Sequence, residues 1–176
     1  NKEVVKKHLI GQHIVGLYPI LPDNASYFIA ADFDGENWLK DSGSFLQACE
    51  EVGLSAYLER SRSGNGGHVW IFFAESYPCY KSRQITLELI RKVFNVSEFE
   101  KEVSFDRLFP NQDTLTGAGF GNLIALPLQG MSVATGNAMF IDPTPSKPFS
   151  DQWQFLSNIK RHTITELDSA HNLLFA

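Results

Sequence analysis

The sequence predicts an α+β fold, a sandwich in which helices pack on a sheet whose strands pair partly through a hairpin. Three observations lead to this class. An apolar run at 27–34 has the composition of a buried strand, and segments 42–52 and 82–94 repeat apolar residues at helical spacing. A glycine-rich connection at 62–67 joins two further strand-like segments. This hairpin argues against a doubly wound parallel sheet, whose strands need long crossovers.

Size and composition are those of an ordinary globular protein. The 176 residues, with 43% hydrophobic and 20% charged side chains, suit a single domain over 1–176 or two small subdomains that share a cleft. No apolar run approaches membrane-spanning length and no signal-peptide core opens the chain, so we expect a cytoplasmic protein with no membrane partner. Cys49 and Cys79 form no C-x-x-C pair, which predicts two free thiols rather than a zinc knuckle.

Net charge limits the possible partners. A value of −5 is unfavourable for binding nucleic acid, because affinity for phosphates comes mainly from basic side chains. Any nucleic-acid surface would therefore be local, built from basic residues in the middle of the chain and from acidic residues that bound cations neutralise.

The first half of the chain divides into five elements. Residues 3–10 predict a short helix, and 11–21 is punctuated by glycine and proline. After the apolar strand, Asp41 or Ser42 is the expected N-cap of a helix that ends at Gly53. The hairpin strands are expected at 55–61 and 68–74.

The second half is less regular. A helix is predicted at 82–94, a short strand at 103–105, a long loop at 108–121, and strands at 123–128 and 138–141. Asp151 is the expected cap of a last helix that carries Trp153, Phe155, Leu156 and Ile159.

Two aspartates interrupt the apolar strand. Because side chains alternate along a strand, Asp32 and Asp34 point to the same side, with Cα atoms roughly 7 Å apart. Neighbouring carboxylates repel unless a cation or a proton lies between them, so the pair predicts a metal site. The alternative is that the strand ends early and Asp34-Gly35 is a simple turn.

The glycine-rich hairpin is the second unusual segment. Its glycines let the backbone approach a ligand and expose N–H groups to phosphate oxygens. His68 begins the following strand, where it shares one face with Trp70 and Phe72, while Val69, Ile71 and Phe73 take the other. The alternative is an ordinary turn with a surface histidine, because the segment matches neither the Walker nor the dinucleotide-binding pattern.

Taken together, the aspartate strand and the histidine hairpin resemble the catalytic centre of the archaeo-eukaryotic primase superfamily. The likeness is greatest to the primase-polymerase domain of bacterial conflict systems, which accompanies helicase and nuclease domains, and it extends over most of the chain. Other matching segments are Gly11-Gln12-His13, 105–113, 121–130 and Asp151-Gln152-Trp153.

This resemblance implies a fold in which an N-terminal αβ unit packs on an RRM-like unit with the active site in the cleft between them. It also implies that Asp32, Asp34 and Asp106 are catalytic and hold Mg²⁺ or Mn²⁺, Asp142 being the alternative third acid. The nucleotide-binding residues that it implies are Arg62, Ser63, Gly64, Asn65, Gly66 and His68.

One departure from the superfamily concerns phosphate binding. Relatives often have an arginine in the strand near 122–127, whereas this chain has Asn122 and Gln129 there. Arg60, Arg62 and Arg107 are the remaining candidates for a phosphate-binding arginine.

The expected function is template-directed nucleotidyl transfer by a DNA primase-polymerase, with nucleoside triphosphates and a DNA template-primer as partners. We expect the chain to be part of a larger protein with helicase and nuclease domains. Two alternatives stay open: a nucleic-acid or nucleotide-binding module of the same fold with weak or no turnover, and a metal-dependent glycosyltransferase, because D-x-D also binds nucleotide-sugar diphosphates through a cation.

Overall fold

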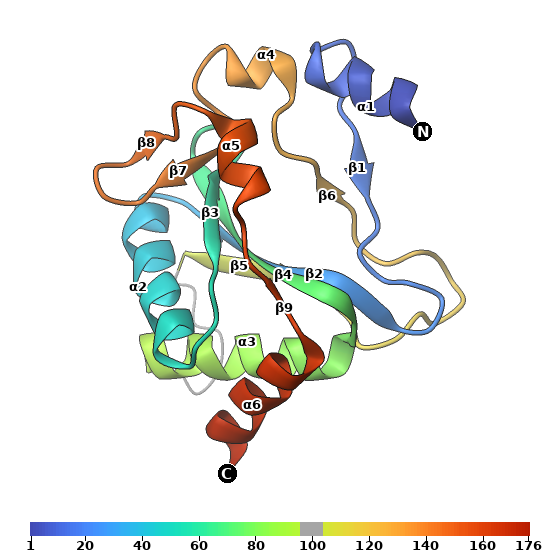
Figure 1. The fold of residues 1–176 in the computed structure, drawn as a ribbon, viewed down its shortest axis with the longest axis vertical. Helices are drawn as coiled ribbons and strands as arrows, with labels where there is room; N and C mark the ends of the chain where they lie inside the picture. The colour runs from blue at the N-terminus through green and yellow to red at the C-terminus, as the bar shows by residue number, and fades with distance from the viewer. Residues whose placement is uncertain (96–103) are drawn as a thin grey trace.

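The computed structural model describes residues 1–95 and 104–176, and its helices and strands form one layered α+β arrangement (Figure 1). The helices are α1 (Lys2–Leu9), α2 (Trp38–Glu51), α3 (Cys79–Phe94), α4 (Gly130–Val133), α5 (Gln152–Ser157) and α6 (Ile164–Phe175). The strands are β1 (Gly16–Leu17), β2 (Ala25–Asp34), β3 (Tyr57–Arg60), β4 (Gly66–Pro78), β5 (Phe105–Phe109), β6 (Ile124–Ala125), β7 (Met139–Asp142), β8 (Lys147–Pro148) and β9 (Arg161–His162).

A seven-stranded sheet organises the fold. Its order is β5-β2-β4-β3-β7-β8, and β9 pairs with β4 in parallel. β2, β3, β4 and β5 are joined by antiparallel pairing, and β4 follows β3 through the predicted hairpin. β1 and β6 form a separate two-stranded sheet. The α+β class is therefore confirmed.

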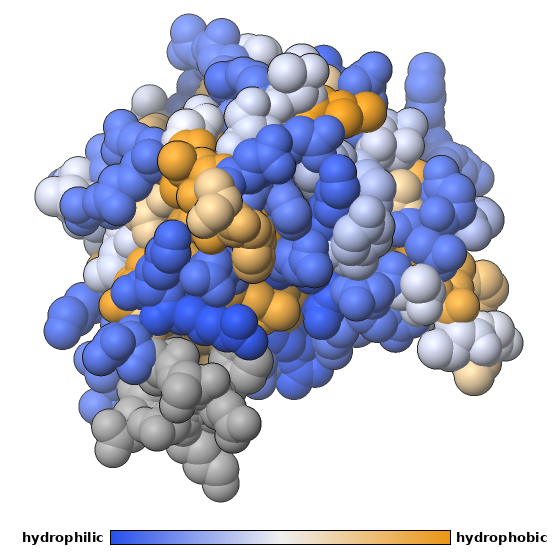
Figure 2. All heavy atoms as spheres, turned by 90° about the horizontal axis from the view of Figure 1, so that it is seen from below, coloured by the Kyte–Doolittle hydropathy of each residue, from blue (hydrophilic) through white to orange (hydrophobic). Residues whose placement is uncertain are grey.

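One face of the sheet, called here the helix face, is apolar and covered by α2, α3 and α6 (Figure 1). Ile29, Ala31 and Phe33 of β2 point to this face, as alternation requires. Phe45 of α2 is fully buried against them, with its ring centroid 5.7 Å from that of Phe33. Figure 2 views the molecule from the side of α3 and α6, where apolar groups interrupt a mostly hydrophilic surface; Leu173 of α6 is exposed.

The opposite face, called here the site face, is apolar only in part. Phe28 and Ala30 of β2 pack there with Trp70 of β4 and Phe109 of β5. Ile124 of β6 adds to this second cluster, and side chains of β7 and α5 complete it. Polar residues take over where β2, β3 and β4 approach the hairpin.

The N-terminal helix attaches to the chain segment that follows β6. The imidazole of His8, which is buried, contacts the Pro127 carbonyl oxygen through Nε2 at 2.9 Å and accepts the Val15 N–H at 3.1 Å. At Gly130 a Cβ atom would lie 2.4 Å from the Leu9 carbonyl oxygen, so only glycine permits this close approach.

Most of the predicted elements form, and the alternation predicted for 68–73 is confirmed by the two apolar clusters. The first helix, the hairpin and the helix predicted at 82–94 are present, the last beginning already at Cys79. Among the described residues, no helix is long and apolar enough to cross a membrane.

Several boundaries were wrong. α2 begins at Trp38, before the predicted caps, and Leu108 and Phe109 belong to β5 rather than to a loop. The strand predicted at 123–128 is reduced to Ile124–Ala125. Residue 103, the start of the short strand predicted at 103–105, lies outside the described residues.

The helix that Asp151 caps is also not the last. Asp151 accepts the backbone N–H groups of Trp153 and Gln154, as predicted for an N-cap, but the helix ends at Ser157, before Ile159. α6 follows it and was missed.

Candidate active site

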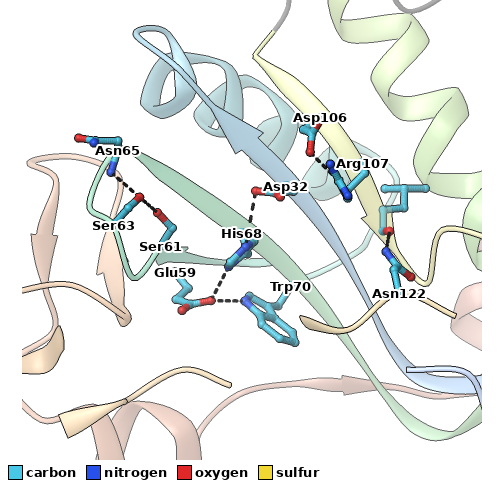
Figure 3. Close-up of polar contacts among 11 residues, drawn as sticks. Asp32, Glu59, Ser61, Ser63, Asn65, His68, Trp70, Asp106, Arg107 and Asn122 are labelled. Carbon is cyan, nitrogen blue, oxygen red and sulfur yellow. Dashed lines mark hydrogen bonds and ion pairs between the residues drawn. The ribbon is translucent and has the colours of Figure 1, made fainter. Parts of the chain in front are cut away.

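Three carboxylates meet at the end of β2 on the site face, and two of them, Asp32 and Asp106, are labelled in Figure 3. Asp32 and Asp34 are on β2 and Asp106 is on the neighbouring β5, and one carboxylate oxygen from each lies within 4.8 Å of the others. Asp142 is on β7, with β4 and β3 between it and β2, and it accepts the Thr144 N–H at 2.8 Å. The structure thus brings Asp106, rather than Asp142, to the aspartate pair.

A β-bulge directs Asp106 to this group. Asp32 pairs with Arg107, but the next pair along β2 is Phe33 with Phe105, so Asp106 is an extra residue between two matched pairs. In regular pairing, Asp106 would lie opposite Phe33 and point to the helix face. The bulge instead leaves it next to Asp32 and Asp34.

The glycine hairpin lies directly against the carboxylates. A Cβ atom at Gly66 would be 2.3 Å from Asp34 Oδ1, and one at Gly67 would be 2.6 Å from the Trp38 ring. These two positions therefore need glycine for close approach, and Gly64 has a positive φ of +81°. Of the predicted nucleotide-binding residues, Arg62, Ser63 and Asn65 are exposed at the hairpin, where the Ser63 Oγ accepts the Asn65 N–H (Figure 3).

His68 stands beside the carboxylates on β4. Its Nε2 is 3.5 Å from Asp32 Oδ1, and its Nδ1 is 2.9 Å from Glu59 Oε2. The same Glu59 oxygen accepts the Trp70 indole N–H at 2.9 Å (Figure 3). The imidazole therefore lies between two carboxylates, that of Asp32 in the candidate site and that of Glu59 on β3.

These side chains belong to one row across the sheet. Glu59 is the partner of His68 in the β3–β4 register, His68 is the partner of Asp32 in β4–β2, and Asp32 is the partner of Arg107 in β2–β5. Four adjacent strands thus present acidic, basic, acidic and basic groups in turn. Directly opposite residues have neighbouring side chains, so each charge is flanked by opposite ones.

The electrostatics of the row follow from burial and from these neighbours. Burial raises the pKa of Asp32 to about 6, with a further rise from Asp34 and Asp106 and an opposing effect of His68. Burial alone would lower the pKa of His68, but the hydrogen bond and charge of Glu59, together with Asp32, outweigh it and raise that pKa. A perturbed carboxylate and imidazole in one place are typical of functional sites.

Two of the candidate phosphate-binding arginines already have partners. The Arg107 guanidinium forms an ion pair with Asp106, and Arg60 donates to the carbonyl oxygens of Gly136 and Ser146. Arg60 is thus a structural residue that ties β3 to two loops, whereas Arg62 is exposed.

Asn122 and Gln129, at the positions where the resemblance leads us to expect an arginine, also contribute to the fold. Asn122 donates to the Leu108 carbonyl oxygen and accepts the Asn111 N–H. Gln129 is buried and caps α4 by accepting the Ser132 N–H.

Glu59 is the site residue that sequence reasoning missed. It is only 2% exposed and lies on β3 between β4 and β7. A signal was available, because a glutamate inside a segment predicted as a paired strand is as unusual as the aspartates of β2.

The carboxylate group suits a hard divalent cation. Three carboxylate oxygens form a donor set that Mg²⁺ or Mn²⁺ prefers, with the remaining positions left for water or substrate oxygens. The backbone of Gly66 lies against Asp34, so the hairpin borders this carboxylate group.

A mainly antiparallel sheet covered by helices, with clustered aspartates, a neighbouring histidine and a glycine hairpin, is typical of a primase-like nucleotidyltransferase core. The family model of the archaeo-eukaryotic primase domain of the TOTE conflict system matches residues 1–170, and the chain belongs to this family. The resemblance inferred from sequence is therefore confirmed. No curated protein matches the chain. Primase-like domains of this kind generally use divalent metals, in agreement with the carboxylate group.

Proposed function

We propose that this domain is a DNA primase-polymerase that adds nucleotides to a 3′-hydroxyl under the direction of a template. The observation that carries the proposal is the convergence of Asp32, Asp34 and Asp106 beside His68 and the glycine hairpin. Carboxylates that hold a divalent ion next to a phosphate-binding loop are the parts that phosphoryl transfer requires.

Each part has a separate role in the proposal. The three aspartates would hold Mg²⁺ or Mn²⁺, which when bound activates the 3′-hydroxyl and stabilises charge on the leaving pyrophosphate. The side chains of Ser63 and Asn65, with other N–H groups of the hairpin, would bind the phosphate oxygens. The Gly64 and Asn65 N–H groups are not counted among them, because they donate to the Ser61 carbonyl oxygen and to Ser63 Oγ. His68 in its imidazolium form, which the raised pKa of the ring favours, would donate from Nε2 to the same phosphates, since that atom faces the carboxylate group.

Charge supports the need for a cation. The chain has a net charge of −5, and three carboxylates in one place repel a triphosphate unless an ion neutralises them. Nucleic-acid and nucleotide partners fit a conflict-system primase domain, and helicase and nuclease domains of the same system are the proposed neighbours.

The test is primer extension. The domain is incubated with a primed DNA template, labelled dNTPs and Mn²⁺, and it is compared with a variant that combines Asp32→Ala and Asp34→Ala. Asp142→Ala is the matched control, because this aspartate lies outside the carboxylate group. We expect extension by the wild type and by the control only. Equal extension by the double variant would remove the proposed mechanism.

A second candidate is a nucleotide-binding or nucleic-acid-binding module with weak turnover. It is favoured by the engagement or replacement of the arginines expected to bind phosphate. Arg107 is engaged by Asp106, and Asn122 is used to hold β5 to the following loop. Salt-dependent binding of single-stranded DNA without extension in either metal would favour this candidate.

A further inference from the structure

We propose that Glu59 is a positioning residue that fixes the His68 imidazole with Nε2 directed at the carboxylate group. The identity of the ligand that His68 contacts, a metal-bound nucleoside triphosphate, rests on the proposed function. The role of Glu59 in holding the ring does not depend on it. Glu59 itself does not reach that ligand, because His68 lies between it and Asp32.

Hydrogen bonding determines which ring nitrogen carries the proton. Trp70 Nε1 is only a donor, so the Glu59 oxygen it contacts is an acceptor. The same oxygen is 2.9 Å from His68 Nδ1, which places a proton on Nδ1. Nε2 is then the nitrogen presented to Asp32 and to whatever binds there (Figure 3).

The burial of Glu59 needs an explanation beyond folding. Removing a carboxylate from water costs several kcal/mol unless it is paired and hydrogen-bonded, and an apolar side chain on an interior strand would avoid that cost. Leu58, the preceding residue of β3, points to the helix face instead, where it is 2% exposed and belongs to the apolar core. On the site face, the same strand buries the Glu59 carboxylate next to the His68 ring.

Trp70 holds the carboxylate from the other side. Its ring is buried, stacked on Phe72 with centroids 5.8 Å apart, and edge-on to His68 at 6.2 Å. The indole N–H therefore comes from a rigid group, and it fixes the Glu59 oxygen in the place where His68 meets it. A ligand-facing histidine whose other nitrogen is held by a carboxylate is a recurrent way to set ring orientation.

Binding of Mn²⁺–dATP, measured by calorimetry, tests the proposal through a double-mutant cycle. Glu59→Met removes the acceptor at similar volume, and we expect about tenfold weaker binding, equal to that of His68→Ala. The combined variant should bind within about twofold of His68→Ala alone, because Glu59 acts only through the ring. Glu59→Gln, whose amide oxygen still accepts both N–H groups, should stay within about threefold of the wild type. Additive losses in the combined variant, or wild-type binding by Glu59→Met, would overturn the proposal.

A second readout needs neither metal nor nucleotide. In the metal-free protein labelled with ¹⁵N-histidine, at a pH where the ring is neutral, nuclear magnetic resonance should show the His68 proton fixed on Nδ1 in the wild type and in Glu59→Gln. In Glu59→Met, the ring should interchange between its two tautomers. A proton that stays on Nδ1 in Glu59→Met would contradict the positioning role.

Tyr77→Phe is the control for a merely structural effect. Tyr77 is buried at the far end of β4 from His68, where its hydroxyl donates to Asp168 of α6. This variant should lose stability while keeping the binding of Mn²⁺–dATP and the His68 tautomer.

If the wild type binds Mn²⁺–dATP but extends no primer, the proposed function fails and the test of Glu59 is unaffected. If it binds none, the tautomer alone decides.

Discussion

The two faces of β2 differ in chemistry although they alternate along the same ten residues. On the helix face, Ala31 and Phe33 are at most 1% exposed and meet only apolar neighbours. On the site face, Asp32 and Asp34 follow Ala30 and meet charged groups of β4 and β5. One strand therefore supplies both the core and the candidate site, and the apolar face provides the stability that the charged face lacks.

The charged face is unfavourable for folding in the absence of a metal. Burial disfavours the ionised form of Asp32, and this raises its pKa to about 6. Proteins commonly keep such destabilising groups where function requires them. The difference between the faces can be tested by one variant at a time.

The largest effect is expected on the helix face. Phe45→Ala removes a side chain that is 0% exposed and leaves a cavity beside Phe33, so the free energy of unfolding should fall by about 3–5 kcal/mol. Urea unfolding measures this change. Tyr27→Ala, at a position of β2 that is 54% exposed, should change it by less than about 1 kcal/mol. If both variants lost the same free energy of unfolding, the helix face would not be the main source of stability.

The site face should respond in activity instead. Asp106→Asn should lower the rate of primer extension at least about a hundredfold, equivalent to about 3 kcal/mol, because one carboxylate of the proposed metal site is lost. Urea unfolding should be unchanged within about 0.5 kcal/mol, since Asp106 is exposed. Asp142→Asn should alter neither quantity, and a larger activity loss there than at Asp106 would reverse the assignment of the third acid.

A smaller and opposite effect on stability is expected at Asp32. Because its pKa in the folded protein is about 6, above the ordinary 3.8, its contribution to stability is present below pH 3.8 and lost as pH rises through 6. Asparagine does not ionise, so in EDTA at pH 7.5 Asp32→Asn should be about 2 kcal/mol more stable than the wild type.

Urea unfolding at pH 7.5 and at pH 4.5 checks this sign. The advantage of Asp32→Asn should shrink at the lower pH, and Mn²⁺ should stabilise the wild type more than the variant. An advantage that does not depend on pH would mean that ionisation of Asp32 is not its cause.

The smallest effect is expected in the helix layer, away from the site. Gly43 lies inside α2, and a Cβ atom there would meet nothing within 4 Å. Gly43→Ala should therefore raise the free energy of unfolding by about 0.5–1 kcal/mol, because alanine loses less conformational entropy in a helix. Mn²⁺ binding by calorimetry should not change, and a shift in its affinity would show that the two faces are coupled.

Local periodicity explains what could be predicted from the sequence. Alternation is enough to place Asp32 with Asp34, and His68 with Trp70, because both relations lie within one strand. The position of Asp106 came from the family resemblance alone. Its approach to the pair depends on a bulge, which no periodicity reveals.

Other differences have particular causes. Asp41 looked like an N-cap, but its carboxylate accepts the N–H and the hydroxyl of Ser104, so it anchors the chain just before β5 while α2 begins earlier. α6 was readable, because Thr163 and Glu166 form a capping box three residues apart. Glu59 stands out in sequence as a glutamate inside a predicted strand, but its partner could be identified only from the pairing of β3 with β4, which places it opposite His68.

The bulge in β5 also restricts how the length of the chain can change. Deleting Asp106 would remove the bulge together with the third carboxylate. Deleting Arg107 would also remove the bulge, by placing Asp106 directly opposite Asp32 in regular pairing, and would remove the partner of its ion pair. Loop residues 110–123 carry no such constraint on their number. We therefore expect insertions and deletions to be tolerated after β5 and not within it, so a scan of single-residue deletions across 104–123 should show a sharp boundary at the end of the strand.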